Sequence, residues 1–77
     1  MVTMYTTTWC GHCLRLKTVL GRENIPFREV DIEQNEAAAD LVRTVNDGLQ
    51  TVPTLVFSDG SALTNPSIGE VRAKLTG

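Results

Sequence analysis

The pair Cys10 and Cys13 lies where a β-prone run, residues 2–6, gives way to a pattern typical of a helix. Two cysteines at this spacing, within a strand–helix–strand pattern, are typical of a redox-active dithiol. At the first turn of a helix, unpaired backbone N–H groups and the positive end of the helix dipole favour the thiolate, which is the attacking form. We therefore expect Cys10 to be the nucleophile and Cys13, one turn further along, to be the resolving thiol.

Two other uses of this cysteine pair are less favoured. A structural disulfide that closes so small a ring removes little entropy from the unfolded chain, about 2 kcal/mol in the loop model. A closed zinc site needs four ligands, and the chain offers two cysteines and one histidine, all in the same turn. The remaining ligands would have to come from a partner chain, so we predict no metal site.

Length and composition indicate one small domain, residues 1–77, with 42% hydrophobic residues. No run is long enough to cross a membrane, and the start of the chain lacks the basic and apolar regions of a secretory signal. Since both cysteines lie in the motif, we expect a cytoplasmic protein. The net charge of −2 and the dispersed seven Lys and Arg residues argue against nucleic-acid or membrane partners, and we expect a monomer.

Apolar spacing and turn residues predict seven elements. Strands are expected at 2–6, 27–32, 51–57 and 62–63, with Pro53 at the start of the third because proline cannot donate to a central ladder. Helices are expected from 10 or 11 to 20, from about 35 to 45, and from 67 onward. The first helix between two strands makes them parallel. The predicted class is α/β, in the order β-α-β-α-β-β-α, with a four-stranded mixed sheet flanked by three helices.

Local signals mark the ends of these elements, and apolar stripes mark their buried faces. The signals are Gly21 ending the first helix, Asn35 or Asp31 capping the second, Asn46-Asp47-Gly48 ending it, Asp59-Gly60 turning the hairpin, and a capping box from Ser67 to Glu70. The stripes expected to face the sheet are Cys13, Leu16, Val19 and Leu20; then Ala38, Leu41, Val42 and Val45; then Ile68, Val71 and Leu75.

This order of elements resembles the glutaredoxin branch of the thioredoxin fold, and within it the mycoredoxins of actinobacteria. The resemblance covers nearly the whole chain. It rests on Trp9-Cys10-Gly11-His12-Cys13, Val45-Asn46-Asp47-Gly48, Thr51-Val52-Pro53-Thr54, and Asp59-Gly60-Ser61 leading to Thr64-Asn65-Pro66.

The resemblance implies a binding surface beside the cysteines. It implies a cis peptide between Val52 and Pro53, with Thr51 next to it and the Val52 backbone open to a substrate strand or a thiol cofactor. Glutaredoxins commonly grip glutathione with a Gly-Gly and acidic segment, which is absent here, so another thiol such as mycothiol is favoured. Asn65 and Ser67 are the polar candidates for that contact, and a plain helix cap is the alternative for Ser67.

Residues around the motif are expected to tune or extend the site. Trp9 would shield the sulfur and offer an apolar contact, with a core position as the alternative, and Gly11 and His12 lie between the cysteines. His12 departs from the family pattern, which usually has Tyr; Cys-Gly-His-Cys is the pattern of protein disulfide isomerases. A protonated imidazole would stabilise the Cys10 thiolate, which predicts a more oxidising couple than that of thioredoxin. Lys17, on the same side of the helix as Cys10, would hold an anionic substrate or the thiolate, or be simply solvated.

The function that the resemblance implies is reduction of mixed disulfides between proteins and mycothiol. Mycothiol, or another low-molecular-weight thiol, would be a co-substrate recycled by an NADPH-dependent disulfide reductase, and no tightly bound cofactor is expected. Two alternatives stay open. One is a dithiol hydrogen donor to ribonucleotide reductase, recharged by thioredoxin reductase. The other, from a different class, is an iron–sulfur carrier.

Overall fold

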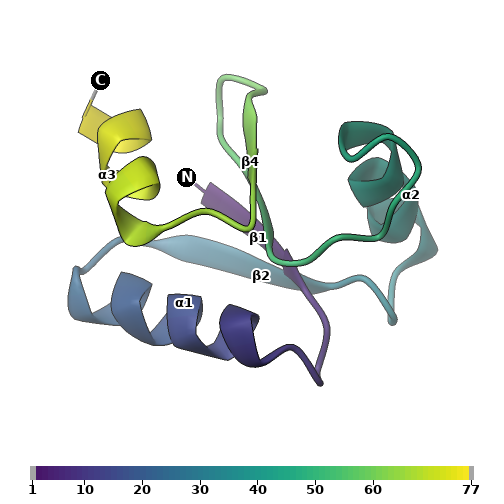
Figure 1. The fold of residues 1–77 in the computed structure, drawn as a ribbon, viewed down its shortest axis with the longest axis horizontal. Coiled ribbons are helices and arrows are strands. Elements are labelled where there is room, and N and C mark those ends of the chain that lie inside the picture. Colours follow the sequence, from purple (N-terminus) through teal and green to yellow (C-terminus); the bar gives the residue numbers. More distant parts are fainter. Residues whose placement is uncertain (1, 77) are drawn as a thin grey trace.

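In a computed structural model that describes residues 2–76, the chain forms a four-stranded sheet with three helices, in the predicted order (Figure 1). The strands are β1 (Val2–Thr6), β2 (Phe27–Asp31), β3 (Thr54–Val56) and β4 (Ala62–Thr64). The helices are α1 (Gly11–Arg22), α2 (Glu36–Val45) and α3 (Ile68–Thr76). Met1 and Gly77, the two ends of the expected domain, lie outside the described residues.

The sheet is mixed, as predicted, with the strand order β2-β1-β3-β4. β1 and β2 are parallel, with Val2 opposite Phe27 and Thr6 opposite Asp31. β3 is antiparallel to both β1 and β4. β1 is therefore a central strand, and the cysteine motif follows directly from its carboxyl end.

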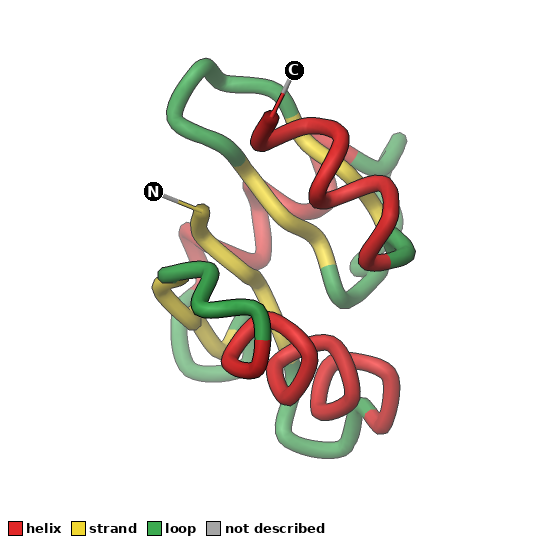
Figure 2. Tube along the Cα trace, turned by 90° about the vertical axis from the view of Figure 1, so that its left-hand side faces the viewer, coloured by secondary structure: helices red, strands yellow, loops and turns green. Residues whose placement is uncertain are grey.

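Side chains on the two faces of the sheet form two apolar clusters. Helices α1 and α3 lie on one face and α2 on the other; in Figure 2 the first two are on the near side of the strands. The first cluster contains Val2, Met4, Leu16, Leu20, Leu55, Phe57 and Val71, and the second contains Ile32, Ala38, Ala39 and Val42. Burial on both faces holds β1, and hence the start of α1, in a fixed position.

Helix α1 is longer than predicted, because it continues through Gly21 to Arg22. A glycine inside a helix costs about 1 kcal/mol relative to alanine but does not forbid the helix. After Arg22 and the capping residue Glu23, the chain turns away from the helix at Asn24, whose φ of 56° lies in the left-handed region. There the N–H of Ile25 donates to the carbonyl of Leu20 at 2.9 Å.

The apolar stripes were wrong for α2 and for the end of α3. Leu41, Val45 and Leu75 are exposed. Helix α2 instead contacts the sheet through the small side chains of Ala38 and Ala39 together with Val42, so its buried face is rotated relative to the predicted stripe. Leu75 lies in the last turn of α3, and among the described residues of this helix it is Val71, nearer the start, that is buried.

Three strands differ slightly in length from the predicted ones. β3 begins after Pro53, β2 ends before the buried Ile32, and β4 extends to Thr64.

The predicted helix caps are confirmed. Asn35 caps α2 by accepting a hydrogen bond from the N–H of Ala38 at 3.0 Å. Ser67 and Glu70 form the reciprocal capping box of α3. No helix within residues 2–76 is long and apolar enough to span a bilayer.

Candidate active site

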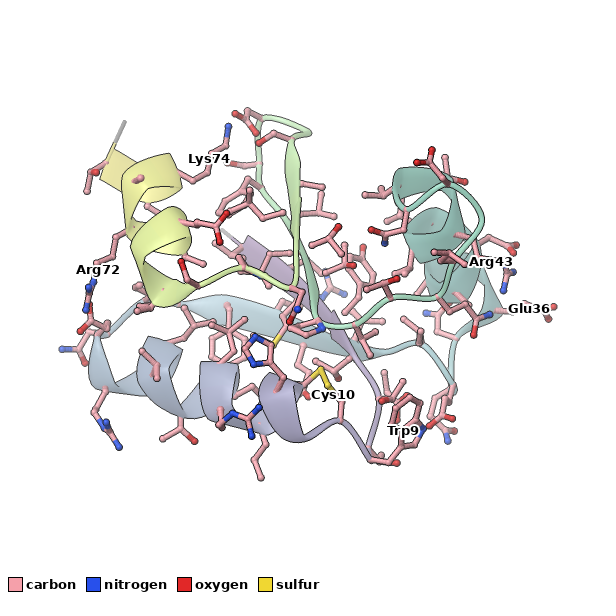
Figure 3. The ribbon with its side chains drawn as sticks, viewed as in Figure 1. Trp9, Cys10, Glu36, Arg43, Arg72 and Lys74 are labelled. Carbon is pink, nitrogen blue, oxygen red and sulfur yellow. A yellow bond between two sulfur atoms is a disulfide. The ribbon has the colours of Figure 1, made fainter. Side chains whose placement is uncertain are left out.

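Cys10 and Cys13 are joined by a disulfide at the amino end of α1 (Figure 3). Cys10 is the N-cap of the helix, and its sulfur accepts a hydrogen bond from the N–H of Cys13 at 3.0 Å. The two sulfurs differ in access, because Cys13 is only 1% exposed whereas Cys10 is half-buried. The helix terminus supplies N–H donors and a positive dipole end to the more accessible sulfur, which is the arrangement that stabilises a thiolate.

The Val52–Pro53 segment lies on one side of the disulfide. The peptide bond between these residues is cis, as the resemblance implied. The Cys10 sulfur is 4.0 Å from the carbonyl oxygen of Val52, and the N–H of Asn65 donates to the carbonyl of Pro53 at 2.7 Å. The structure thus brings Cys10, the 51–53 segment and Asn65 together.

Asn46 connects α2 to this segment and was not identified as a site residue from the sequence. Its side-chain amide donates to the carbonyl of Val42 at 2.9 Å and to the hydroxyl of Thr54 at 3.1 Å. The Thr54 hydroxyl in turn donates to the carbonyl of Thr51 at 2.7 Å, and the Thr64 hydroxyl donates to the Asn46 carbonyl oxygen. This network fixes the segment that faces Cys10 to the end of α2 and to β4.

A groove of about 620 Å³ lies on the other side of the disulfide. We call it the Trp9 groove; its lining residues are Thr6, Thr7, Thr8, Trp9, Cys10, Gly11, Cys13, Leu14, Lys17, Glu29 and Asp31. Neither the 51–53 segment nor Asn65 lines it. Trp9 is 71% exposed, which excludes the core position considered as an alternative, and Leu14 is also exposed.

The indole of Trp9 is held in place by a hydrogen bond that the sequence did not reveal. Its Nε1–H donates to Oε2 of Glu33 at 3.1 Å. Glu33 follows β2, and its own N–H donates to Oδ1 of Asp31 at 2.9 Å. These contacts link the turn before α1 to the end of β2. They hold the Trp9 side chain beside Cys10, as Figure 3 shows.

Lys17 lies in the Trp9 groove, but its charge is compensated. Its Nζ is 3.0 Å from Oε2 of Glu29, which also accepts a hydrogen bond from the Thr6 hydroxyl at 2.9 Å. Partial burial raises the pKa of Glu29, but the hydrogen bonds from Lys17 and Thr6 outweigh it, so this pKa lies below its ordinary value. The role of Lys17 toward an anionic substrate stays a prediction, and the ion pair with Glu29 weighs against it.

The remaining candidates have simpler surroundings. His12 is half-buried, and within residues 2–76 its Nε2 is buried without a hydrogen-bond partner. A Cβ at Gly11 would only meet the end of the Arg15 side chain at 3.8 Å, so packing does not demand glycine there. Ser67 serves as the cap of α3 through the N–H of Glu70, at 3.2 Å. Within residues 2–76, no group of three or more His, Cys, Asp or Glu side chains is placed to hold a metal ion.

Together, a Cys-x-x-Cys disulfide that opens a helix after a central strand, with a cis-proline segment beside it, defines a thiol–disulfide oxidoreductase of the thioredoxin fold. The glutaredoxin family model matches residues 2–62. A Mycobacterium tuberculosis protein named as a glutaredoxin is 62% identical over 74 residues, which cover 96% of this chain and 88% of that protein. Mycoredoxin 1 of Corynebacterium glutamicum is 42% identical over 74 residues, covering 96% and 91%. The chain belongs to the glutaredoxin family.

Solved structures confirm the fold. The thioredoxin-like protein BC3987 is 25% identical, with a TM-score of 0.80 over 95% of this chain and 97% of that chain. A glutaredoxin from Archaeoglobus fulgidus is 23% identical, with a TM-score of 0.81 over 99% of this chain and 86% of that chain. The expected class, a four-stranded mixed sheet with three helices, is therefore correct.

Proposed function

We propose that this glutaredoxin-family oxidoreductase reduces mixed disulfides between proteins and mycothiol. The observation that carries the reaction type is the unequal access to the two sulfurs, since only Cys10 is open to a substrate. The choice of thiol is supported by the 42% identity with Mycoredoxin 1 and by the Thr64-Asn65-Pro66-Ser67 segment, which lacks the Gly-Gly and acidic residues that commonly grip glutathione.

The reaction proceeds through two exchanges at Cys10. The Cys10 thiolate attacks the mycothiol sulfur of the mixed disulfide, forming a Cys10–mycothiol disulfide and releasing the protein thiolate. A second mycothiol thiolate then attacks the mycothiol sulfur on Cys10, which releases the Cys10 thiolate and mycothiol disulfide. An NADPH-dependent reductase returns the mycothiol disulfide to two thiols. Cys13 is not needed in this route.

The Val52 side of the disulfide receives the small thiol. The backbone of Val52, between Thr51 and Pro53, pairs with the amide groups of the small thiol. Asn65 offers a polar side chain next to this backbone segment. Ser67 accepts a hydrogen bond within its helix cap, which leaves its hydroxyl proton as a donor. Asn65 has a left-handed backbone conformation, and its N–H donates to the carbonyl of Pro53 at 2.7 Å, which keeps it beside this segment.

We assign the reaction to the reducing cytoplasm and to a monomer, because the chain has only the two motif cysteines and the chemistry needs one chain. Its partners are protein mixed disulfides, mycothiol and the reductase that recycles mycothiol disulfide. The two exchanges use no metal and no resident cofactor.

Trapping the first intermediate tests this proposal. Reduced Cys13→Ser, mixed with a protein that carries one mycothiol-capped cysteine, should yield a Cys10–mycothiol adduct and free protein thiol by mass spectrometry. Cys10→Ser should yield neither. The same protein capped with glutathione should react more slowly. An adduct between Cys10 and the protein, or faster reaction with the glutathione cap, would contradict the proposal.

A further inference from the structure

The Trp9 groove carries an excess of negative charge beside the disulfide. Glu29 and Asp31 are two residues apart on β2 and so face the same side of the sheet. Lys17 neutralises Glu29. Asp31 lines the groove and accepts from the N–H of Glu33. Glu33 is not a lining residue, but its carboxylate lies beside the groove, where it accepts from the Trp9 indole. Both of these donors are neutral. Among residues 2–76, neither Asp31 nor Glu33 has a cationic partner within salt-bridge distance.

An aromatic face lies next to these carboxylates. Trp9 is largely exposed, and its bond to Glu33 fixes the edge of the ring, which leaves the indole face to the groove and to solvent. An indole face attracts a Lys or Arg side chain, and more strongly where carboxylates lie close by. The exposed side chain of Leu14 adds apolar surface for the stem of such a residue.

The groove also contains a polar group that the protein leaves unsatisfied. Thr7 lines the groove and is 7% exposed, and its hydroxyl has no hydrogen-bond partner within residues 2–76. Buried hydroxyls are normally paired, so an unpaired one in the wall of a groove fits a surface that binds a polar chain.

The position of the groove separates it from the side that receives the small thiol. Both cysteines line it, whereas Val52, Pro53 and Asn65 lie on the other side of the disulfide. A mixed disulfide has two substituents, one on each sulfur. If the small thiol occupies the Val52 side, the polypeptide extends over the Trp9 groove.

We propose that the Trp9 groove binds the polypeptide part of a disulfide substrate and favours a Lys or Arg side chain next to the substrate cysteine. The charges of Asp31 and Glu33 and the face of Trp9 provide this preference. The inference rests on the proposed function in requiring a polypeptide disulfide whose other sulfur lies on the Val52 side, and it does not depend on which small thiol is used.

Peptides of one sequence, with Lys, Gln or Glu beside a single cysteine, test this preference. The cysteine is capped with 2-mercaptoethanol. The Cys10 thiolate of the reduced protein attacks the sulfur of this small cap and releases the peptide thiol, and Cys13 then attacks Cys10 and releases mercaptoethanol. Chromatography of the released peptide gives the second-order rate constant. We expect the Lys peptide to react about fivefold faster than the Glu peptide at low salt, and the ratio to fall as salt is added.

Isosteric variants separate the charge from the structure. Asp31→Asn and Glu33→Gln keep an acceptor for the N–H of Glu33 and for the Trp9 indole but remove the charge. Each should reduce the Lys-to-Glu ratio, and the double variant should bring it close to one. Glu36→Gln is the matched control, because Glu36 lies on α2 outside the groove and points away from it in Figure 3. Because the Lys-to-Glu ratio compares two peptides on the same variant, any change in the reactivity of Cys10 itself cancels in it.

Two results would overturn the inference. One is a Lys-to-Glu ratio near one in the unaltered protein, and the other is an unchanged ratio in the double variant. These peptides carry no mycothiol. A charge preference found here, together with failure of the mycothiol trapping experiment, would therefore exclude mycothiol as the co-substrate while supporting the Trp9 groove as the polypeptide-binding surface.

Discussion

The Cys10 sulfur lies 4.0 Å from the carbonyl oxygen of Val52, while its disulfide partner Cys13 is buried beneath it. This relationship gives the two cysteines different environments although they are three residues apart. One sulfur faces a backbone segment and solvent at a helix terminus, and the other is buried.

The first prediction concerns the reactivity of the two thiols in the reduced protein. Because the alkylating species is the accessible thiolate, iodoacetamide should modify Cys10 at least about tenfold faster than Cys13. Peptide mass spectrometry after brief exposure at neutral pH measures both sites. Equal labelling, or faster labelling of Cys13, would contradict the assigned roles.

His12 is predicted to make the couple more oxidising. A protonated imidazole beside Cys10 would stabilise the thiolate and therefore the reduced form, so the potential should lie above the thioredoxin value of about −270 mV, toward the value of about −180 mV for protein disulfide isomerase. His12→Tyr should shift it to a more negative value. Equilibration of both proteins with a redox buffer of known potential checks this, and an identical potential would be evidence against it.

How far the sequence could predict the site depends on how far apart the contributing residues are. The place of the cysteine pair at the start of α1, the caps at Asn35 and Ser67, and the strand–helix–strand unit depend on neighbouring residues, and these predictions are confirmed. The contact between Trp9 and Glu33 spans 24 residues. It depends on how β2 aligns with β1, which no local pattern specifies.

The errors have similar causes. Gly21 was taken as a helix end because glycine often follows the last turn, but the left-handed residue after α1 is Asn24. Leu41 and Val45 were placed in the core by their spacing, whereas the small side chains of Ala38 and Ala39 make the contact with the sheet. Helical spacing defines several overlapping stripes, and the packing of the whole domain selects one.

Asn46 is predicted to stabilise the segment that faces Cys10. Asn46→Ala removes the two hydrogen bonds that its amide donates and leaves the Thr64 hydroxyl without its acceptor. Unfolding in urea should show a loss of about 1–3 kcal/mol. Gln34→Ala, in an exposed loop, is the control and should change stability by less than about 0.5 kcal/mol. A similarly small loss for Asn46→Ala would show that the network does not hold the segment.

Asp59 is predicted to make stability depend on acid pH. The Ser61 hydroxyl, the Ser61 N–H and the Lys74 ammonium hold the pKa of Asp59 well below its ordinary value. The resulting stabilisation is fully present above the unfolded carboxyl pKa of about 3.9 and is lost as pH falls through the lower folded value. Asp59→Asn should therefore be less stable than the unaltered protein at neutral pH.

Urea unfolding of both proteins from pH 7 down to pH 2 measures that difference. It should stay constant down to about pH 4 and then shrink. Ser61→Ala should also be less stable than the unaltered protein at neutral pH, by a smaller difference that likewise shrinks in acid, because it removes one of the three donors to Asp59. A difference that stays the same across the whole range would show that Asp59 does not titrate with a lowered pKa.

The most direct test of the central claim compares NADPH consumption through two recharging systems acting on one mycothiol-capped protein substrate. One system contains mycothiol and its NADPH-dependent disulfide reductase, and the other contains thioredoxin reductase without a small thiol. We predict turnover in the first system only, retained in Cys13→Ser and lost in Cys10→Ser. Turnover chiefly in the second system, lost in Cys13→Ser, would contradict the account and identify a dithiol electron donor.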